Sequence, residues 1–163
     1  MPRYLFSCAY DGTLWRGWQS QSGGGTVQDC LEAAFEAILR QSLRIHAAGR
    51  TDAGVHALAQ CFHADVPEGC RMSPAAWVAA LNAHLPASVR IGRAEPVAAD
   101  FHARFSALGK VYEYRIWRGA VLPPHLRMRM APPACARCRA LAAGAQLLLR
   151  RARFSPLCGA PRK

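Results

Sequence analysis

The residues best suited to chemistry lie in a short glycine-containing segment, residues 49–57, with the sequence GRTDAGVHA. Asp52 stands there between Arg50 and His56, and two glycines allow the backbone to turn tightly and to approach a ligand closely. A bent loop would let Arg50 keep the Asp52 carboxylate ionised, which suits nucleophilic or base chemistry. An aspartate in such a turn is also a common turn former, and a purely structural ion pair would give the same pattern.

A second segment, residues 10–21, interleaves aromatic rings and one arginine with glycines and amides in the sequence YDGTLWRGWQSQ. Unpaired nucleobases stack on such rings, and arginine binds phosphates or stacks itself. The alternative is that Trp15 and Trp18 are ordinary anchors of the hydrophobic core. For each tryptophan taken singly, the core role is the favoured interpretation.

A third segment runs from residue 100 to residue 114 and ends in the sequence KVYEY. If Lys110, Tyr112 and Tyr114 share one face of a strand, they form a cationic, aromatic wall. Such a wall suits base stacking, but it is equally typical of a solvated sheet face whose long side chains keep their polar tips in water.

The cysteines offer little chemistry. Their number is odd and no secretory signal precedes them, so a disulfide framework is not expected. The Cys135–Cys138 pair has CxxC spacing, but zinc would need further ligands nearby, and none follow. We expect reduced thiols and no metal site. The seven cysteines are Cys8, Cys30, Cys61, Cys70, Cys135, Cys138 and Cys158.

The elements that must position these segments follow from periodicity and from residues that begin or end helices. Strands are predicted at residues 3–10, 43–48, 58–65, 88–98 and 105–117. Helices are predicted at residues 26–41, from Ser73-Pro74 to about Leu85, and at residues 134–151, with loops at residues 11–25, 49–57 and 123–133. Thr26 is the expected N-cap of the first helix. Neighbouring strands interrupted by helices predict an α+β fold, a mostly antiparallel sheet with helices on one face.

Charge is distributed unevenly along the 163 residues, whose formal net charge is +11. Residues 1–113 hold ten basic and ten acidic side chains, whereas residues 114–163 hold eleven basic and no acidic ones. This excludes a uniformly basic, histone-like protein. It leaves a neutral domain with an end that either attracts a polyanion or has an atypical composition. No apolar run approaches the roughly 20 residues of a membrane span, and the start is too short for a secretory signal, so a cytoplasmic location without membrane contact is expected.

Taken together, the motifs resemble those of the tRNA pseudouridine synthases of the TruA type. Order and spacing match over residues 4–118, and the nine-residue match at 49–57 is the most specific part. The match weakens after residue 118. The motifs that carry the resemblance are YDGT and GWQSQ at residues 10–21, TVQ at 26–28, GRTDAGVHA at 49–57, LN and LP at 81–86, DFHARFS at 100–106 and KVYEY at 110–114.

The resemblance implies the pseudouridine synthase fold, here its N-terminal half, and conversion of a uridine at positions 38–40 of the tRNA anticodon stem-loop into pseudouridine. It implies no cofactor and no catalytic metal. By the same resemblance, Asp52 is the catalytic nucleophile, Arg50 holds and orients it, Tyr112 stacks on the target base and Lys110 is the basic substrate-binding residue. Three further motif residues are expected to support the site: His56, Gln60 and Arg104.

The resemblance also implies a domain organisation. Residues 1–118 are expected to form the N-terminal pseudouridine synthase domain, and residues 119–163 a basic, Ala/Arg-rich tail that begins a truncated second half. In the family, that second half completes the active-site wall and most of a homodimer contact. Three interpretations therefore stay open: a functional shortened synthase, a catalytically inactive RNA-binding remnant, and a gene fragment.

Overall fold

Four antiparallel strands form one sheet in the first of the two compact units into which the chain divides, Met1–Tyr112 and Glu113–Lys163. The strands lie in the order β2-β3-β1-β4, so the first strand of the sequence has a neighbour on each side. Phe6 at the centre of the sheet is opposite Phe62 on one neighbour and Ala94 on the other. The bounds are β1 Arg3–Tyr10, β2 Ile45–Ala47, β3 Ala57–Asp65 and β4 Val89–Val97.

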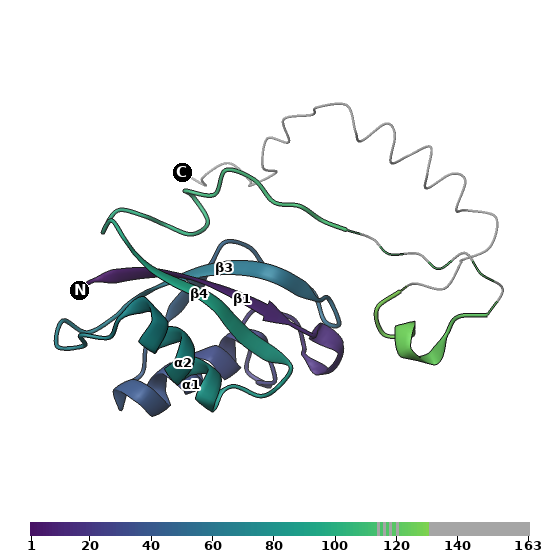
Figure 1. The fold of residues 1–163 in the computed structure, drawn as a ribbon, viewed down its shortest axis with the longest axis horizontal. Coiled ribbons are helices and arrows are strands. Elements are labelled where there is room, and N and C mark those ends of the chain that lie inside the picture. Colours follow the sequence, from purple (N-terminus) through teal and green to yellow (C-terminus); the bar gives the residue numbers. More distant parts are fainter. Residues whose placement is uncertain (114, 116, 118, 120, 131–163) are drawn as a thin grey trace. The chain divides into compact units, whose positions relative to one another are not determined.

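Two helices, α1 (Val27–Leu39) and α2 (Pro74–His84), cover the same face of this sheet (Figure 1). The Thr26 hydroxyl accepts the Asp29 N–H at 3.2 Å, and the Asp29 carboxylate accepts the Thr26 N–H in return, which makes a capping box. Such a cap contributes about 1 kcal/mol. The predicted N-cap and the predicted α+β class with helices on one face are confirmed.

The core between helices and sheet is largely aromatic. Phe6 and Phe62 stack at 5.2 Å between ring centroids, and Phe35 of α1 meets Phe6 edge-on at 5.3 Å. Trp77 of α2 lies 5.6 Å from Phe35. All four rings are fully buried, so they fix the positions of both helices against the central strands.

The other face of the sheet carries alternate residues of the same strands, because side chains along a strand point to opposite faces in turn. Leu5 of β1 is opposite His63 of β3, and His63 is opposite His46 of β2. The chain returns to this face after β4, since the Ala103 N–H donates to His63 Nδ1 at 3.1 Å. The turn at residues 101–106 is therefore anchored on the sheet.

The structure is a computed structural model that describes residues 1–113, 115, 117, 119 and 121–130. The predicted helix at 134–151, and Tyr114, Cys135, Cys138 and Cys158, lie outside those residues. Among the residues of the second unit that the structure describes, Pro124–Leu126 form a 3₁₀ turn, η2. The domain boundary expected between residues 118 and 119 stays a prediction. No helix in the described part of the chain is long and apolar enough to cross a bilayer.

The strand predicted at residues 105–117 is wrong for the residues described there, none of which is in a strand. The alternating pattern is present, but no strand of the described chain lies alongside it to accept its backbone hydrogen bonds. Leu108 and Val111 are accordingly fully exposed. An alternating segment without a partner strand gains neither ladder hydrogen bonds nor side-chain burial, so its pattern alone does not make it a strand.

Candidate active site

Two loops meet where β1 ends and β3 begins, and one of them carries Asp52. The first comprises residues 11–18 and the second residues 49–56. The backbone N–H of Trp18 donates to the Thr51 carbonyl at 3.0 Å, and the Gly54 N–H donates to the Trp15 carbonyl at 3.3 Å. We call this pair of loops the loop clamp. Within the loop clamp, the first loop holds the backbone of the predicted catalytic segment on both sides of Asp52.

Side-chain hydrogen bonds near the end of β1 also connect the two loops. The hydroxyls of Tyr10 and Thr51 are 2.8 Å apart. Burial raises the pKa of the Tyr10 phenol to about 12, so the ring stays protonated. Next to it, the Gly12 N–H donates to His56 Nδ1 at 3.3 Å, and the same nitrogen lies 3.3 Å from the Asp11 carboxylate. His56 thus contacts both Gly12 and Asp11 of the first loop, and its supporting role in the site stays a prediction.

Glycine is required on the first loop because the two backbones approach each other so closely. A β-carbon on Gly12 would stand 2.0 Å from the Val55 carbonyl oxygen. A β-carbon on Gly17 would stand 2.7 Å from the Thr51 oxygen, and the φ angle of Gly17 is +89°. Any larger residue would push the loops apart. This contact explains why the first loop carries glycines where it meets the segment at residues 49–56.

Asp52 itself is exposed at the tip of this assembly. Its carbonyl accepts the Val55 N–H at 3.2 Å, which closes a tight turn, while its carboxylate points to no partner among the described residues. Arg50 forms no ion pair with it in the described part of the chain, so the pairing expected from their spacing is not made in this structure. The carboxylate is left open to an approaching ligand.

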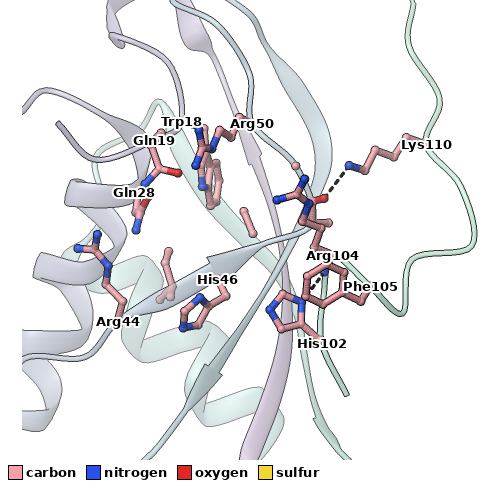
Figure 2. Close-up of a pocket in the computed structure, with 14 residues that line it drawn as sticks. Trp18, Gln19, Gln28, Arg44, His46, Arg50, His102, Arg104, Phe105 and Lys110 are labelled. Carbon is pink, nitrogen blue, oxygen red and sulfur yellow. Dashed lines mark hydrogen bonds between the residues drawn. The ribbon is translucent and has the colours of Figure 1, made fainter. Parts of the chain in front are cut away.

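A pocket of about 660 Å³ opens beside the loop clamp (Figure 2). Four of its lining residues are Arg or Lys, and the lining contains no Asp or Glu among the described residues. Arg50 and Lys110, predicted as site residues, both line it, whereas Asp52 and Tyr112 do not. The lining residues are Trp18, Gln19, Gln28, Arg44, Ile45, His46, Ala47, Ala48, Gly49, Arg50, His102, Arg104, Phe105 and Lys110.

Lys110 is tied to Ala48, next to the start of the predicted catalytic segment, although the two lie 62 residues apart in sequence. Its ammonium donates to the Ala48 carbonyl at 2.6 Å, directly before Gly49. A β-carbon on Gly49 would stand 2.6 Å from the same ammonium. Gln60 donates to the Gly49 carbonyl from the other side. The structure therefore brings Lys110 to the Arg50 side of the loop, while the Tyr112 ring, 69 % exposed, stays in solvent.

Trp18 has the core role that the sequence favoured. The ring is 1 % exposed and packs 5.9 Å from Tyr10 and 6.0 Å from Phe62. Its edge reaches the pocket wall, but no face of the ring is free to stack on a base.

Three histidines form a cluster at the pocket wall, where His46 and His102 line the pocket and His63 does not. His63 is 2 % exposed and lies 5.0 Å from the His46 ring and 4.6 Å from the His102 ring. Burial, together with His102, Arg3 and His46, lowers the pKa of His63 to about 4, against a smaller opposing effect of Asp65. His63 is therefore neutral near pH 7 and accepts the Ala103 N–H. Among the residues described, no group of His, Cys, Asp or Glu could hold a metal ion.

Sequence reasoning missed part of the pocket wall. His102, Phe105 and Gln28 were recognised only as members of motifs, and Arg44 was not considered. The first two were detectable, because an aromatic ring and an imidazole in a segment between elements often contact a ligand. Arg44 was not, because its position depends on Glu32 of α1, whose carboxylate it meets at 3.3 Å.

Comparison with known proteins places these features in a family. A family model described as tRNA pseudouridine synthase matches residues 7–106, which include both loops of the clamp and the turn at 101–106. The chain belongs to the tRNA pseudouridine synthase family. The resemblance predicted from the motifs is thereby confirmed.

Individual relatives agree with this family assignment. The tRNA pseudouridine synthase A of Akkermansia muciniphila is 56 % identical over 124 residues, covering 76 % of this chain and 47 % of the relative. That of Solidesulfovibrio magneticus is 53 % identical over 127 residues, covering 76 % and 46 %. That of Paramagnetospirillum magneticum is 46 % identical over 158 residues, covering 95 % and 60 %. The chain spans about half the length of most of these curated relatives.

Proposed function

We propose that this chain isomerises a uridine of tRNA to pseudouridine, with the Asp52 carboxylate as the nucleophile. The observation that carries the proposal is the loop clamp, which fixes the backbone around Asp52 and leaves its carboxylate exposed beside a basic pocket. A catalytic group on a rigid turn needs little ordering when the substrate arrives. The family membership of the chain supports the same reaction.

The proposed reaction exchanges one bond for another within a nucleotide. The N1–C1′ bond breaks, the detached base turns, and C5 bonds to C1′; the C5 hydrogen leaves as a proton and N1 gains one. No net oxidation occurs, so no redox cofactor is required. The carboxylate of Asp52 would act at C1′ or at C6 or remove a sugar proton, and all three steps need an ionised, accessible carboxylate.

The proposed substrate is the anticodon arm, at positions 38–40. A target base must leave its stack, which costs a few kcal/mol, and needs a ring to receive it. The exposed Tyr112 ring offers that surface, and Lys110 offers a positive charge at the adjoining loop. Arg50 is proposed to orient the carboxylate once RNA is bound. We further propose a cytoplasmic location. The resemblance implies a homodimer whose contact lies mostly in the second half of the family's proteins, and sedimentation at several concentrations would test whether this chain forms one.

The proposal is tested by incubating the purified chain with an unmodified anticodon-arm transcript and detecting pseudouridine through its carbodiimide adduct. Product is expected with the natural chain and none with Asp52→Ala. Glu36→Ala removes a carboxylate that is also exposed, on α1, and should leave product formation unchanged. Equal product from Asp52→Ala and the natural chain would contradict the proposal.

The second candidate function is RNA binding without isomerisation. Two observations favour it. Arg50 and Asp52 form no ion pair in the described part of the chain, and Tyr112 does not line the pocket. The same experiment separates the two candidates. Salt-sensitive RNA binding with no pseudouridine from the natural chain would establish the binding function instead.

A further inference from the structure

The turn at residues 101–106 forms part of the pocket wall and presents an aromatic ring to solvent. Phe105 is 77 % exposed although it lines the pocket. The His102 ring lies 4.4 Å away at an interplanar angle of 34°, and the Arg104 guanidinium lies 5.9 Å from the Phe105 centroid (Figure 2). Single-stranded nucleic acid is bound by such combinations, because every base has a π-face that stacks on an aromatic ring.

This ring is held in place even though it is exposed. The Ala103 N–H donates to the buried His63 imidazole at 3.1 Å, and the Arg3 guanidinium donates to the Phe101 carbonyl at 2.7 Å. Within the turn, the His102 N–H donates to the Ser106 hydroxyl at 3.0 Å. A ring on an anchored turn loses little conformational freedom when a ligand stacks on it, which favours binding.

The remaining wall is suited to a phosphate. Lys110 uses one donor on the Ala48 carbonyl, and an ammonium has three donors. Arg50 has no ion-pair partner among the described residues, whereas Arg44 is neutralised by Glu32 at 3.3 Å. Lys110 and Arg50 therefore leave positive charge in the pocket lining, and Phe105 provides the stacking surface. The volume of about 660 Å³ lies within the usual 300–1,000 Å³ of small-ligand sites.

We propose that this pocket binds one unpaired nucleotide of the RNA, with its base stacked on Phe105 and its phosphate at Lys110. Because Asp52 does not line the pocket, this nucleotide is a neighbour of the isomerised one and not the target itself. The inference rests on the proposed function for the identity of the ligand as RNA. It assigns Phe105 a substrate-binding role separate from that of Tyr112.

The first test measures binding of a fluorescently labelled uridine pentanucleotide by anisotropy over a range of salt concentrations. Phe105→Leu should weaken binding about tenfold, as loss of one base stack does, without changing the salt dependence. Lys110→Gln should lower the slope of log K against log salt by about 0.7, the value for one phosphate on a single strand. Phe105→Trp should restore the affinity.

Matched controls remove one exposed apolar side chain and one exposed cation outside the pocket. Leu108→Ala removes another exposed apolar side chain of the same segment, and Arg71→Gln removes an exposed cation before α2. Neither should change affinity or slope. Because Phe105 is exposed, the thermal midpoint of Phe105→Leu should equal that of the natural chain.

The second test removes one base at a time from the pentanucleotide, leaving the sugar and phosphate. At one position, loss of the base should weaken binding to the natural chain but not to Phe105→Leu, because both changes remove the same stack. Unchanged binding by Phe105→Leu, or equal weakening at every position in both proteins, would overturn the inference. So would an equal loss of slope in Arg71→Gln and Lys110→Gln, which would indicate diffuse attraction.

These outcomes separate the inference from the proposed function. Pseudouridine formation with Phe105-independent binding would leave the isomerase proposal intact and refute the nucleotide pocket. Phe105-dependent binding without pseudouridine formation would keep the pocket and refute the isomerase.

Discussion

The loop clamp and the segment at residues 107–112 both reach the basic pocket, but they are held in very different ways. The loop clamp is fixed by several backbone hydrogen bonds and by the close approach of Gly12 to Val55. The segment at 107–112 is tied to its own unit, within the described chain, by the Lys110–Ala48 hydrogen bond. The difference teaches that Asp52, the residue proposed to break the bond, has a fixed backbone, while Tyr112, the ring proposed to receive the base, has little to hold it.

The largest effect should come from placing a methyl group between the two loops. Gly12→Ala puts a β-carbon 2.0 Å from the Val55 oxygen, so the loops must separate. We expect a loss of about 3 kcal/mol in the free energy of unfolding, measured with urea. Gly109→Ala in the other segment meets nothing within 4 Å and should be close to neutral. Equal effects of the two substitutions would remove the contrast between the regions.

The next effect concerns His63, which anchors the turn on the far wall. His63→Leu leaves the Ala103 N–H without its acceptor and should destabilise the protein by about 2 kcal/mol at pH 7.5. His63→Asn can place its side-chain oxygen near the position of Nδ1 and should recover part of that loss. Urea unfolding of both variants measures this. Equal destabilisation by Leu and Asn would show that the acceptor is not what matters.

The same histidine predicts a pH dependence of stability. Because the pKa of His63 is lowered to about 4 in the folded protein, from about 6.5 when unfolded, only the unfolded chain takes up a proton between these values. The contribution of neutral His63 to the free energy of unfolding is complete above pH 6.5. It is lost as the pH falls toward 4, and the loss is about 2 kcal/mol at pH 5. His63→Asn should show a shallower decline over this range. Parallel declines would place the titration on other groups.

A smaller effect is expected inside the loop clamp. Thr51→Val keeps the shape of the side chain but removes the 2.8 Å contact with the Tyr10 hydroxyl, which should cost about 1 kcal/mol. Tyr10→Phe should cost a similar amount. The double variant should cost less than the sum, since both changes remove one interaction. Strict additivity of the unfolding free energies would mean that the two hydroxyls do not interact.

The smallest effect on stability should come from the tether of the second segment. Lys110→Met removes a single, partly buried hydrogen bond to Ala48 and should change the free energy of unfolding by about 1 kcal/mol or less. Hydrogen exchange of the backbone amides at residues 107–112 should nevertheless quicken. A large loss of global stability would show that this segment is as firmly integrated as the loop clamp.

Much of the fold was predictable because its signals are local. The apolar stripe and Thr26 cap of α1 are both encoded within a few residues, and the Ser73-Pro74 start of α2 is as local. The placement of Asp52 on a tight loop followed from its neighbouring glycines. The strand at 105–117 was predicted wrongly because alternation is local, whereas a strand also depends on a partner elsewhere in the chain.

The site was predictable as a set of residues but not as an arrangement. That Gly12 must be a glycine depends on Val55, forty-three residues later, and no pattern near either residue shows the contact. The spacing of Arg50 and Asp52 indicated an ion pair, yet the turn directs Arg50 into the pocket and leaves Asp52 outside its lining. The exposure of Phe105 depends on where the His63 anchor places its turn. Such contacts arise only when distant segments fold together.

The central claim is that the Asp52 carboxylate, fixed by the loop clamp, breaks the glycosidic bond of a uridine. The most direct measurement is release of tritium from C5 of uridine in an anticodon-arm RNA, at saturating protein, by the natural chain and by Asp52→Asn. The account predicts release by the natural chain and a rate at least about a thousandfold lower for Asp52→Asn, with unchanged RNA affinity. Release at comparable rates by both proteins, or no release by the natural chain with RNA bound, would contradict it.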